Sequence, residues 1–354
     1  MSPARRIGLV GTGLMGSHHA WALQALHAAE LTDARLAVVY DANPERLAAA
    51  AGRLGAPAAP HLAGMVEDVD IVWICTWTAA HLETARVAAA AGRAVFVEKP
   101  LAPTLADCEA LAALLRGTPH QVGLILRHAP AYALVVSEVG SGRYGRPMGA
   151  FFRDDQRFPV DATYGSTWRA DAAAAGGGTL IEHSIHDVDV LSWLLGPPAA
   201  VSAQTTSFAG VPGIEDLAMV RMRFAEGHSA GLLSVWHRVE SRTTNRRLEV
   251  FCEDAVLWMD GEVGPLHVET SSGVTVHDVP MPAFLDQLPL AEVPEGWRLA
   301  AGGLAIQARS FLEALREGKP AGWPTVDDAL VAHRAVDAAY RSAAGGGAEV
   351  SCAP

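Results

Sequence analysis

The chain has 354 residues, enough for about two domains and a sizeable core, and half of its residues are hydrophobic, which excludes a disordered protein. Its formal net charge is −12 with no basic block, which argues against a nucleic-acid ligand. We expect a cytoplasmic protein without a membrane anchor, because no apolar run could span a bilayer, no signal peptide precedes the first strand, and the four cysteines form no C-x-x-C pair.

The first predicted element is a short apolar strand at 6–10, followed by a glycine-rich turn and a helix at about 14–29. A G-x-G-x-x-G turn between a strand and a helix is typical of dinucleotide-binding proteins, and a plain glycine-rich turn is the alternative. Gly11 permits the tight turn, Gly13 lets the backbone approach a pyrophosphate, and Gly16 allows close packing of helix and strand. The predicted cofactor contacts in this turn are Gly11, Thr12, Gly13, Leu14, Met15 and Gly16.

A second strand at 36–40 ends in Asp41, where dinucleotide-binding proteins place an acid against the adenosine ribose. A carboxylate there accepts hydrogen bonds from both ribose hydroxyls and repels a 2′-phosphate, so the sequence favours NAD over NADP. Arg46, one turn into the next helix, is a further predicted cofactor contact, because it could stack on the adenine or meet a phosphate.

Two more buried strands are predicted at 70–75 and 93–97. The first leads into the loop 76–81, and the second ends in Glu98-Lys99-Pro100. Because unpaired charges are costly to bury, this tripeptide is expected to line a cleft, with an exposed strand-to-helix turn as the alternative. The predicted cofactor contacts in these loops are Thr76, Trp77, His81, Glu98 and Lys99.

A helix that Thr104 can cap and a strand at 121–126 continue the alternation of strands and helices. This alternation is typical of a doubly wound parallel sheet, in which ligands bind where the carboxyl ends of the strands meet. We therefore predict an α/β dinucleotide-binding domain over residues 1–125.

The pattern changes after Arg127, which is predicted to contact the cofactor. A helix at 131–141 and a strand at 147–153 are followed by an irregular stretch and by Gly176-Gly177-Gly178. Further on, successive strands with short turns predict an antiparallel sheet. Residues 126–354 should therefore form a second domain of the α+β class. It should contain helices at 179–195, 304–317 and 327–342, and strands within 199–279.

Glu182 and His186 are four residues apart on the predicted helix 179–195, hence on one face. A carboxylate beside an imidazole orients that base, as is needed when a histidine takes a proton from a hydroxyl while hydride leaves the same carbon. Two alternatives remain. The pair could lie on a solvated helix face, or His183 and His186 with nearby acids and His237 could bind a metal ion.

The order of these motifs resembles the Gfo/Idh/MocA oxidoreductases, a family that includes glucose-fructose oxidoreductase and inositol dehydrogenase. The resemblance covers nearly the whole chain. Its motifs are GTGLMG, Asp41, the 76–81 loop, Glu98-Lys99-Pro100-Leu101, Trp168-Arg169, the three glycines, and Glu182-x-x-x-His186-x-x-Asp189. Two departures stand out: Glu182 replaces the usual aspartate, and Trp77 replaces a frequent proline.

The resemblance implies an N-terminal Rossmann domain and a C-terminal α+β domain with a largely antiparallel open sheet. Through that sheet such proteins often assemble, so a homo-oligomer, dimer or tetramer, is expected. It further implies a sugar, polyol or cyclitol substrate, with Lys99 at the reacting oxygen and His186 as the acid/base. Pro100 is expected to follow a cis bond.

Together these patterns predict an NAD-dependent dehydrogenase or reductase with Lys99, His186 and Glu182 as catalytic residues and no bound metal. The predicted substrate contacts are Lys99, Tyr164, Trp168, Arg169, Glu182, His183 and His186, with Trp236 and His237 as further candidates. One rival hypothesis is a catalytically silent dinucleotide-binding regulator. The other is a metal-assisted enzyme that uses His183 and His186.

Overall fold

The computed structural model describes residues 4–160, 165–242, 244–293 and 295–353, so the predicted substrate contact Tyr164 lies outside the described residues. By its internal contacts the chain divides into two compact units. The first comprises Met1–Ala102, Ala106–Ile125 and Met281–Asp328, and the second comprises Pro103–Leu105, Leu126–Pro280 and Ala329–Pro354. Residues 281–328 thus group with the first unit, while a domain boundary at residue 125 stays a prediction. No described helix is both long and apolar enough to cross a membrane.

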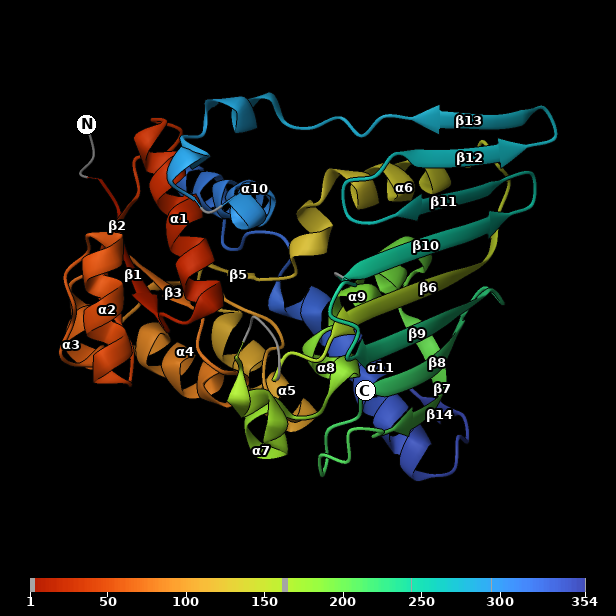
Figure 1. Ribbon diagram of the computed structural model, residues 1–354, viewed down its shortest axis with the longest axis horizontal. Helices are drawn as coiled ribbons and strands as arrows, with labels where there is room; N and C mark the ends of the chain where they lie inside the picture. The colour runs from red at the N-terminus through yellow and green to blue at the C-terminus, as the bar shows by residue number, and fades with distance from the viewer. Residues whose placement is uncertain (1–3, 161–164, 243, 294, 354) are drawn as a thin grey trace. The chain divides into compact units, whose positions relative to one another are not determined.

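The first unit contains a parallel five-stranded sheet in the order β2-β1-β3-β4-β5 (Figure 1), which confirms the predicted doubly wound fold. Its strands are β1 (Arg6–Val10), β2 (Arg35–Tyr40), β3 (Ile71–Ile74), β4 (Ala94–Val97) and β5 (His120–Val122). Its helices are α1 (Leu14–Ala28), α2 (Pro44–Leu54), α3 (Leu62–Glu67), α4 (His81–Ala90), α5 (Leu105–Leu115) and α10 (Arg298–Arg316). The strand order reverses between β1 and β3, and the carboxyl ends beside such a switch point are where open α/β sheets bind ligands.

An aromatic cluster lies at the centre of this unit. Trp73 of β3 stacks on Phe96 of β4 with ring centroids 4.1 Å apart, and Phe311 of α10 packs against both rings. Each of the three side chains is almost completely buried. Helix α10, more than 200 residues after β4 in the sequence, therefore contributes to the core that covers β3 and β4.

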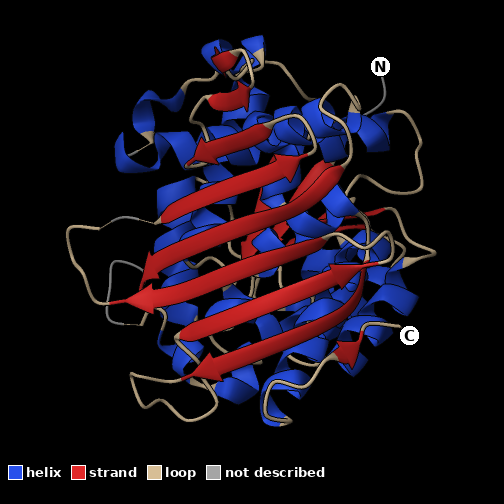
Figure 2. Cartoon of the chain, turned by 90° about the vertical axis from the view of Figure 1, so that its right-hand side faces the viewer, coloured by secondary structure: helices blue, strands red, loops and turns tan. Residues whose placement is uncertain are grey.

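The second unit contains a nine-stranded sheet in the order β13-β12-β11-β10-β6-β9-β8-β7-β14, whose strands face the viewer in Figure 2. Only β6 and β9 pair in parallel, so the predicted, largely antiparallel sheet is confirmed. Its strands are β6 (Pro147–Arg157), β7 (Pro198–Thr206), β8 (Leu217–Phe224), β9 (Ser229–His237), β10 (Asn245–Cys252), β11 (Val256–Asp260), β12 (Leu266–Thr270), β13 (Gly273–His277) and β14 (Val350–Ser351). The helices of this part are α6 (Pro130–Gly140), α7 (Ala172–Ala175), α8 (Thr179–Glu182), α9 (Ile185–Leu195) and α11 (Val326–Ala344).

The prediction of one helix at 179–195 is wrong, because the segment forms α8 and α9 with a break at His183 and Ser184. The hydroxyl of Ser184 lies 2.9 Å from Asp154 Oδ2 and 2.7 Å from Ser234 Oγ, so its hydrogen bonds tie the break to the sheet. Hydrogen bonding by serine side chains competes with helical geometry. The argument that Glu182 and His186 share a face through regular helical spacing therefore does not apply.

A buried group of charges lies between α9 and the sheet, centred on Arg246 of β10. Its guanidinium donates to Asp187 Oδ1 at 2.9 Å and to Asp154 Oδ2 at 3.4 Å, and it also contacts Glu262. Burial and the charge of Asp154 raise the pKa of Asp187. Burial alone would also raise the pKa of Asp154, but the charges of Arg246 and His183 outweigh it and lower that pKa.

Removing this arginine should strongly destabilise the second unit. We expect Arg246→Leu to lower the free energy of unfolding by about 3–5 kcal/mol, because buried carboxylates lose their partner. The matched control is Arg247→Leu on the same strand, where ion pairs to Glu249 and Asp260 are partly exposed and the loss should stay below about 1 kcal/mol. Urea unfolding curves of both variants measure the difference, and equal losses would contradict this account.

Candidate active site

The glycine-rich turn joins β1 to α1 and uses each glycine differently. Gly11 has a positive φ of 87°, and a Cβ there would lie 2.5 Å from the Cys75 carbonyl oxygen. A Cβ on Gly16 would lie 1.9 Å from the Gly11 carbonyl oxygen. A Cβ on Gly13, by contrast, would have no described heavy atom within 4 Å. Two glycines are thus required by packing, while Gly13 leaves open space above the turn.

This turn has the features of a phosphate site. Gly13 is the N-cap of α1, so it offers no side chain to the amide groups of the first turn, which begins with Leu14 and Met15. Free amide groups and the positive end of the helix dipole favour a phosphate at such a position. The backbone amides of this turn therefore suit the pyrophosphate of a dinucleotide, without a basic side chain from the turn.

Asp41 at the end of β2 is bonded to the same turn. Its Oδ2 accepts hydrogen bonds from the backbone amide (2.8 Å) and hydroxyl (3.0 Å) of Thr12, and its Oδ1 accepts from the backbone amide of Asn43 at 2.9 Å. The exposed Arg46 places Nη1 3.9 Å from Asp41 Oδ2. The carboxylate is thus held in place by the glycine turn, which suits a fixed acceptor for ribose hydroxyls.

Glu98 at the end of β4 is buried against α1. Its Oε1 lies 2.7 Å from Nε2 of His19, and its Oε2 accepts the backbone amide of Lys99 at 3.0 Å. Burial alone would raise the pKa of Glu98, but the hydrogen bond and charge of His19, with the charge of Lys99, hold that pKa below its usual value. Glu98 is therefore ionised near neutral pH, and His19 must donate through Nε2.

The loop after β3 contacts the segment after β4. His81, the first residue of α4, places Nδ1 2.8 Å from the Pro100 carbonyl oxygen and Nε2 3.2 Å from the Thr76 carbonyl oxygen. Its side chain is almost fully buried, whereas Trp77 is 40% exposed. Both ring nitrogens of His81 thus face main-chain oxygens. Its contact with the cofactor stays a prediction. The Lys99–Pro100 bond is cis.

In the second unit, Glu182 accepts a hydrogen bond from Arg169. Arg169 Nε lies 3.1 Å from Glu182 Oε2, its Nη1 donates to the Ser166 hydroxyl, and its guanidinium lies 4.4 Å from the centre of the Trp168 ring. Glu182 and His186 are both buried. The structure therefore brings three predicted substrate contacts, Trp168, Arg169 and Glu182, together on α8 and the 3-10 turn before α7.

The other polar side chains of α9 are bonded to further partners. Arg127 donates twice to Asp189, at 2.8 and 2.7 Å, and both are buried. His183 Nε2 lies 3.1 Å from both Asp154 Oδ1 and Arg246 Nη2. The guanidinium of Arg127, which was predicted to contact the cofactor, is thus bonded to Asp189 on α9, the helix that carries His186.

The metal alternative finds no support among these contacts. Asp187 and His183 both meet Arg246, a cation that opposes a second cation nearby. His237 lies 3.4 Å from Asp155 Oδ2 instead of joining them, and Trp236 is buried against Phe158. Among the residues that the structure describes, no three histidine, cysteine or acidic side chains gather in a way that could hold a metal ion.

Sequence reasoning missed three residues that shape the site. Two are His19 and Gly123, where a Cβ would come within 2.7 Å of the Glu98 carboxylate. The third is Glu215, which accepts the backbone amides of Gly178 and Leu180 at 2.7 and 2.9 Å and so holds the start of α8. Nothing in the local sequence distinguishes His19 from His18, and the Glu215 contact spans more than thirty residues.

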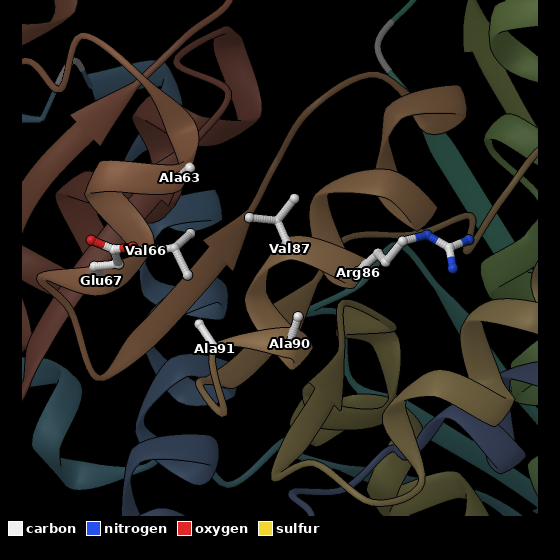
Figure 3. Close-up of a pocket in the computed structure, with 7 residues that line it drawn as sticks. All are labelled: Ala63, Val66, Glu67, Arg86, Val87, Ala90 and Ala91. Carbon is white, nitrogen blue, oxygen red and sulfur yellow. The ribbon is translucent and has the colours of Figure 1, made fainter.

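A separate groove lies on the first unit, between α3 and α4 (Figure 3). It is lined by Ala63, Val66, Glu67, Arg86, Val87, Ala90 and Ala91. None of the predicted site residues lines it.

These features define a Rossmann-type dinucleotide-binding protein in which a charged strand end is bonded to the helix of the glycine turn. Residues 5–125 match the family model described as an oxidoreductase family with an NAD-binding Rossmann fold, and residues 132–258 match the GFO/IDH/MocA C-terminal domain. The chain belongs to the Gfo/Idh/MocA oxidoreductase family, and its cofactor is NAD.

Two curated relatives illustrate the range of similarity. Inositol 2-dehydrogenase 3 of Saccharopolyspora erythraea is 35% identical over 205 residues, which are 56% of this chain and 56% of the relative. Inositol 2-dehydrogenase of Rhizobium meliloti is 28% identical over 352 residues, 96% of this chain and 97% of the relative. The chain matches only 53% to 66% of the length of three curated relatives that are 31–35% identical.

Among solved structures, levoglucosan dehydrogenase in complex with NADH and levoglucosan superposes with a TM-score of 0.85 at 25% identity. The superposition covers 98% of each chain. The likeness therefore extends over both units and includes a protein that was solved with the reduced cofactor.

The glycine turn yields a first prediction about binding. Gly16→Ala should destabilise the protein, because its Cβ would collide with the Gly11 carbonyl oxygen. Gly13→Ala should leave the melting temperature nearly unchanged but weaken NADH binding by about tenfold or more, since the methyl group occupies the space that the pyrophosphate approaches. Thermal unfolding and NADH fluorescence titration measure the two effects. Unchanged NADH affinity in a folded Gly13→Ala variant would contradict the assignment.

Glu98 yields a second prediction, about pH. The pKa of Glu98 is lower in the folded protein than in the unfolded chain, where it is near 4.5. Ionised Glu98 therefore stabilises the fold above pH 4.5, and this contribution is lost as the pH falls through the folded-state pKa. The difference in free energy of unfolding between wild type and Glu98→Gln should therefore be full at pH 7 and shrink below pH 4.5. Glu83→Gln, at an exposed ion pair, is the control. A difference that does not change with pH would refute this reading.

Proposed function

We propose that the protein is an NAD-dependent dehydrogenase or reductase that moves a hydride between the nicotinamide and a hydroxyl-bearing carbon of a sugar, sugar derivative or cyclitol. The observation that carries this proposal is Lys99, a cation at the carboxyl end of β4 whose backbone amide is bonded to the buried Glu98. The same buried Glu98 is bonded to His19 on α1, the helix that the glycine turn begins, and the family of the chain is one of oxidoreductases.

The cofactor supplies the hydride acceptor when it is bound, and this chain supplies binding and orientation. The amide groups at the start of α1 would hold the pyrophosphate, and Asp41, fixed by Thr12, would accept the ribose hydroxyls. Further cofactor contacts proposed from the sequence are Arg46, Thr76 and Trp77.

In the oxidative direction, Lys99 donates a hydrogen bond to the reacting hydroxyl oxygen and stabilises the negative charge that develops there. His186 accepts the hydroxyl proton as the hydride leaves carbon, so a carbonyl forms and the imidazolium later releases the proton to water. Glu182 lies on α8, the helix before His186, and its carboxylate accepts a hydrogen bond from Arg169. Its catalytic role beside His186 stays a proposal from the sequence. The reverse direction uses the same groups with the proton moving from His186 to the carbonyl oxygen.

The names of the relatives support a polyol substrate. They include enzymes named for inositol, levoglucosan, 1,5-anhydro-D-fructose and D-apiose. In this chain Trp168 and Arg169 form a stacked pair next to Glu182, and aromatic faces and charged groups of this kind bind the apolar faces and hydroxyls of sugars. His183 is a further proposed contact.

We further propose that the protein forms a homo-oligomer through the outer face of the nine-stranded sheet. Phe151 of β6, Met219 of β8 and Phe251 of β10 are each more than a third exposed, while their neighbours along each strand are buried. Exposed apolar side chains that gather on one face commonly mark a protein interface. A cytoplasmic location stays a prediction, and it agrees with the four free cysteines.

Single substitutions test the catalytic roles. Lys99→Ala and His186→Ala should each lower kcat by about 10² or more with the best substrate among myo-inositol, levoglucosan and D-apiose, because each removes a group that acts on the reacting hydroxyl. NADH affinity should stay near that of the wild type. Lys319→Ala, which replaces the only other lysine of the chain, and His277→Ala are the matched controls.

Wild-type turnover in either catalytic variant would refute the assigned roles. NADH binding without turnover of any sugar or cyclitol would instead favour a silent dinucleotide-binding regulator.

A further inference from the structure

The backbone of Lys99 is bonded on its N-terminal side to a buried carboxylate. Glu98 accepts the Lys99 amide through Oε2 and meets His19 Nε2 through Oε1, at 3.0 and 2.7 Å. His19 lies on α1, one turn beyond Gly16 of the glycine turn, and its side chain is completely buried. The helix that begins at the dinucleotide turn is thereby bonded to the residue before Lys99.

The backbone is bonded on its C-terminal side as well. His81 Nδ1 lies 2.8 Å from the carbonyl oxygen of Pro100, and its Nε2 lies 3.2 Å from the carbonyl oxygen of Thr76. Carbonyl oxygens only accept, so either ring nitrogen of His81 can be the donor, and we assign the proton to Nδ1, which has the shorter contact, to Pro100. The loop after β3 thus meets the residue that follows Lys99.

A third feature shows that the pocket around Glu98 is fitted to its carboxylate. A Cβ on Gly123, just after β5, would lie 2.7 Å from the Glu98 carboxyl carbon and Oε1 and 2.9 Å from Oε2. The backbone at Gly123 has no positive φ that would demand glycine. Space for Glu98 is therefore the local reason for a glycine at this position.

We propose that His19 and His81 are positioning residues that hold Lys99 in its reactive place from both sides, His19 through Glu98 and His81 through the Pro100 carbonyl. Neither histidine is required to touch the substrate. This inference rests on the proposed role of Lys99 in catalysis. A lysine side chain is long and flexible, so a fixed backbone on both sides reduces the volume that its ammonium can explore.

The geometry predicts that glutamine can replace His19 but not His81, and that asparagine can replace His81 but not His19. Glutamine can place its amide near the position of a histidine Nε2, and asparagine can place its amide near that of Nδ1. His19 uses Nε2, so His19→Gln should keep kcat within about threefold of wild type, whereas His19→Asn should lower kcat by up to about 10², the cost of misplacing a reacting group by about 1 Å. His81 uses Nδ1, so the order should invert: His81→Asn keeps activity and His81→Gln loses it.

The matched control is the neighbouring histidine. His18 is equally buried on α1, but burial and the charge of His19 lower its pKa to about 4, and its ring packs against Trp21 and Trp297. His18→Gln and His18→Asn should therefore not differ from each other in kcat. NADH affinity and melting temperature are recorded for every variant, and the proposal requires that kcat falls while NADH affinity stays within about threefold.

A measurement without substrate is possible because the chain has only two lysines, Lys99 and Lys319. Reductive methylation with ¹³C-formaldehyde keeps the positive charge and labels both side chains together with the terminal amine. Lys319 is largely exposed and serves as the internal reference. The Lys99 methyl resonance should be resolved from that of Lys319 in the wild type, move towards it in His19→Asn and His81→Gln, and return in His19→Gln and His81→Asn.

The same set of variants separates this inference from the proposed function. If Lys99→Ala turns over like the wild type, the proposed function fails, whatever the histidines do. If Lys99→Ala is impaired while His19→Asn and His81→Gln are as active as the wild type, or their Lys99 resonance does not move, only the positioning role is overturned. In the Lys99→Ala background, His19→Asn should change kcat by less than about twofold, since it acts through Lys99.

Should His19→Asn fail to fold, Glu98→Gln keeps the size of the side chain and replaces one acceptor by a donor. It should lower kcat and shift the Lys99 resonance in the same direction, and a wild-type kcat and resonance in Glu98→Gln would overturn the proposal.

Discussion

The buried carboxylate of Glu98 is the constraint on which the first unit's site depends. Burying a charge is unfavourable unless it is paired, and Glu98 is paired twice, with His19 and with the Lys99 amide. The first contact joins β4 to the helix of the glycine turn, and the second fixes the backbone where the chain leaves the sheet. Gly123 leaves the space that this arrangement needs. A single ionised group thus relates the cofactor helix to the residue that we propose polarises the substrate.

In the second unit, buried hydrogen bonds and ion pairs likewise fix the segment that carries candidate site residues. Its candidates Glu182 and His186 lie on α8 and α9, two short helices joined at a break, and short helices have little stability of their own. Glu215 accepts two backbone amides at the start of α8, Ser184 bonds the break to Asp154, and Arg246 neutralises the acids beneath α9. Buried polar groups with satisfied partners specify one arrangement of such a segment better than helix propensity does.

Much of the fold could be predicted from local patterns. The glycine turn, the apolar strands and the change from alternating strands and helices to successive strands depend on residues that are close in sequence, and the structure agrees with the predicted fold class. The single helix at 179–195 was wrong because the bonds of Ser184 to Asp154 and Ser234 are tertiary contacts that no periodicity reveals. For the same reason α10 could be predicted as a helix, but its place in the core with Trp73 and Phe96 could not.

The candidate site shows the same limit. Lys99 and Asp41 follow from motif and strand end, whereas the partners that fix them, such as His19, lie far away in sequence. His81 was predicted to meet the cofactor because it ends a loop that follows a strand of the sheet, and that contact stays a prediction. No local pattern indicated that its ring nitrogens face the carbonyls of Pro100 and Thr76. A pattern of residue types indicates where chemistry can occur, but the hydrogen bonds decide which side chain remains available for it.

We propose that this chain transfers hydride directly between a polyol carbon and the nicotinamide of NAD. The most direct measurement is the fate of deuterium when the purified protein oxidises myo-inositol that carries deuterium on every ring carbon. Direct transfer predicts one deuterium in each NADH formed, at the nicotinamide C4, as measured by mass spectrometry. NADH without deuterium, or no NADH from this or any other polyol of the panel, would contradict it.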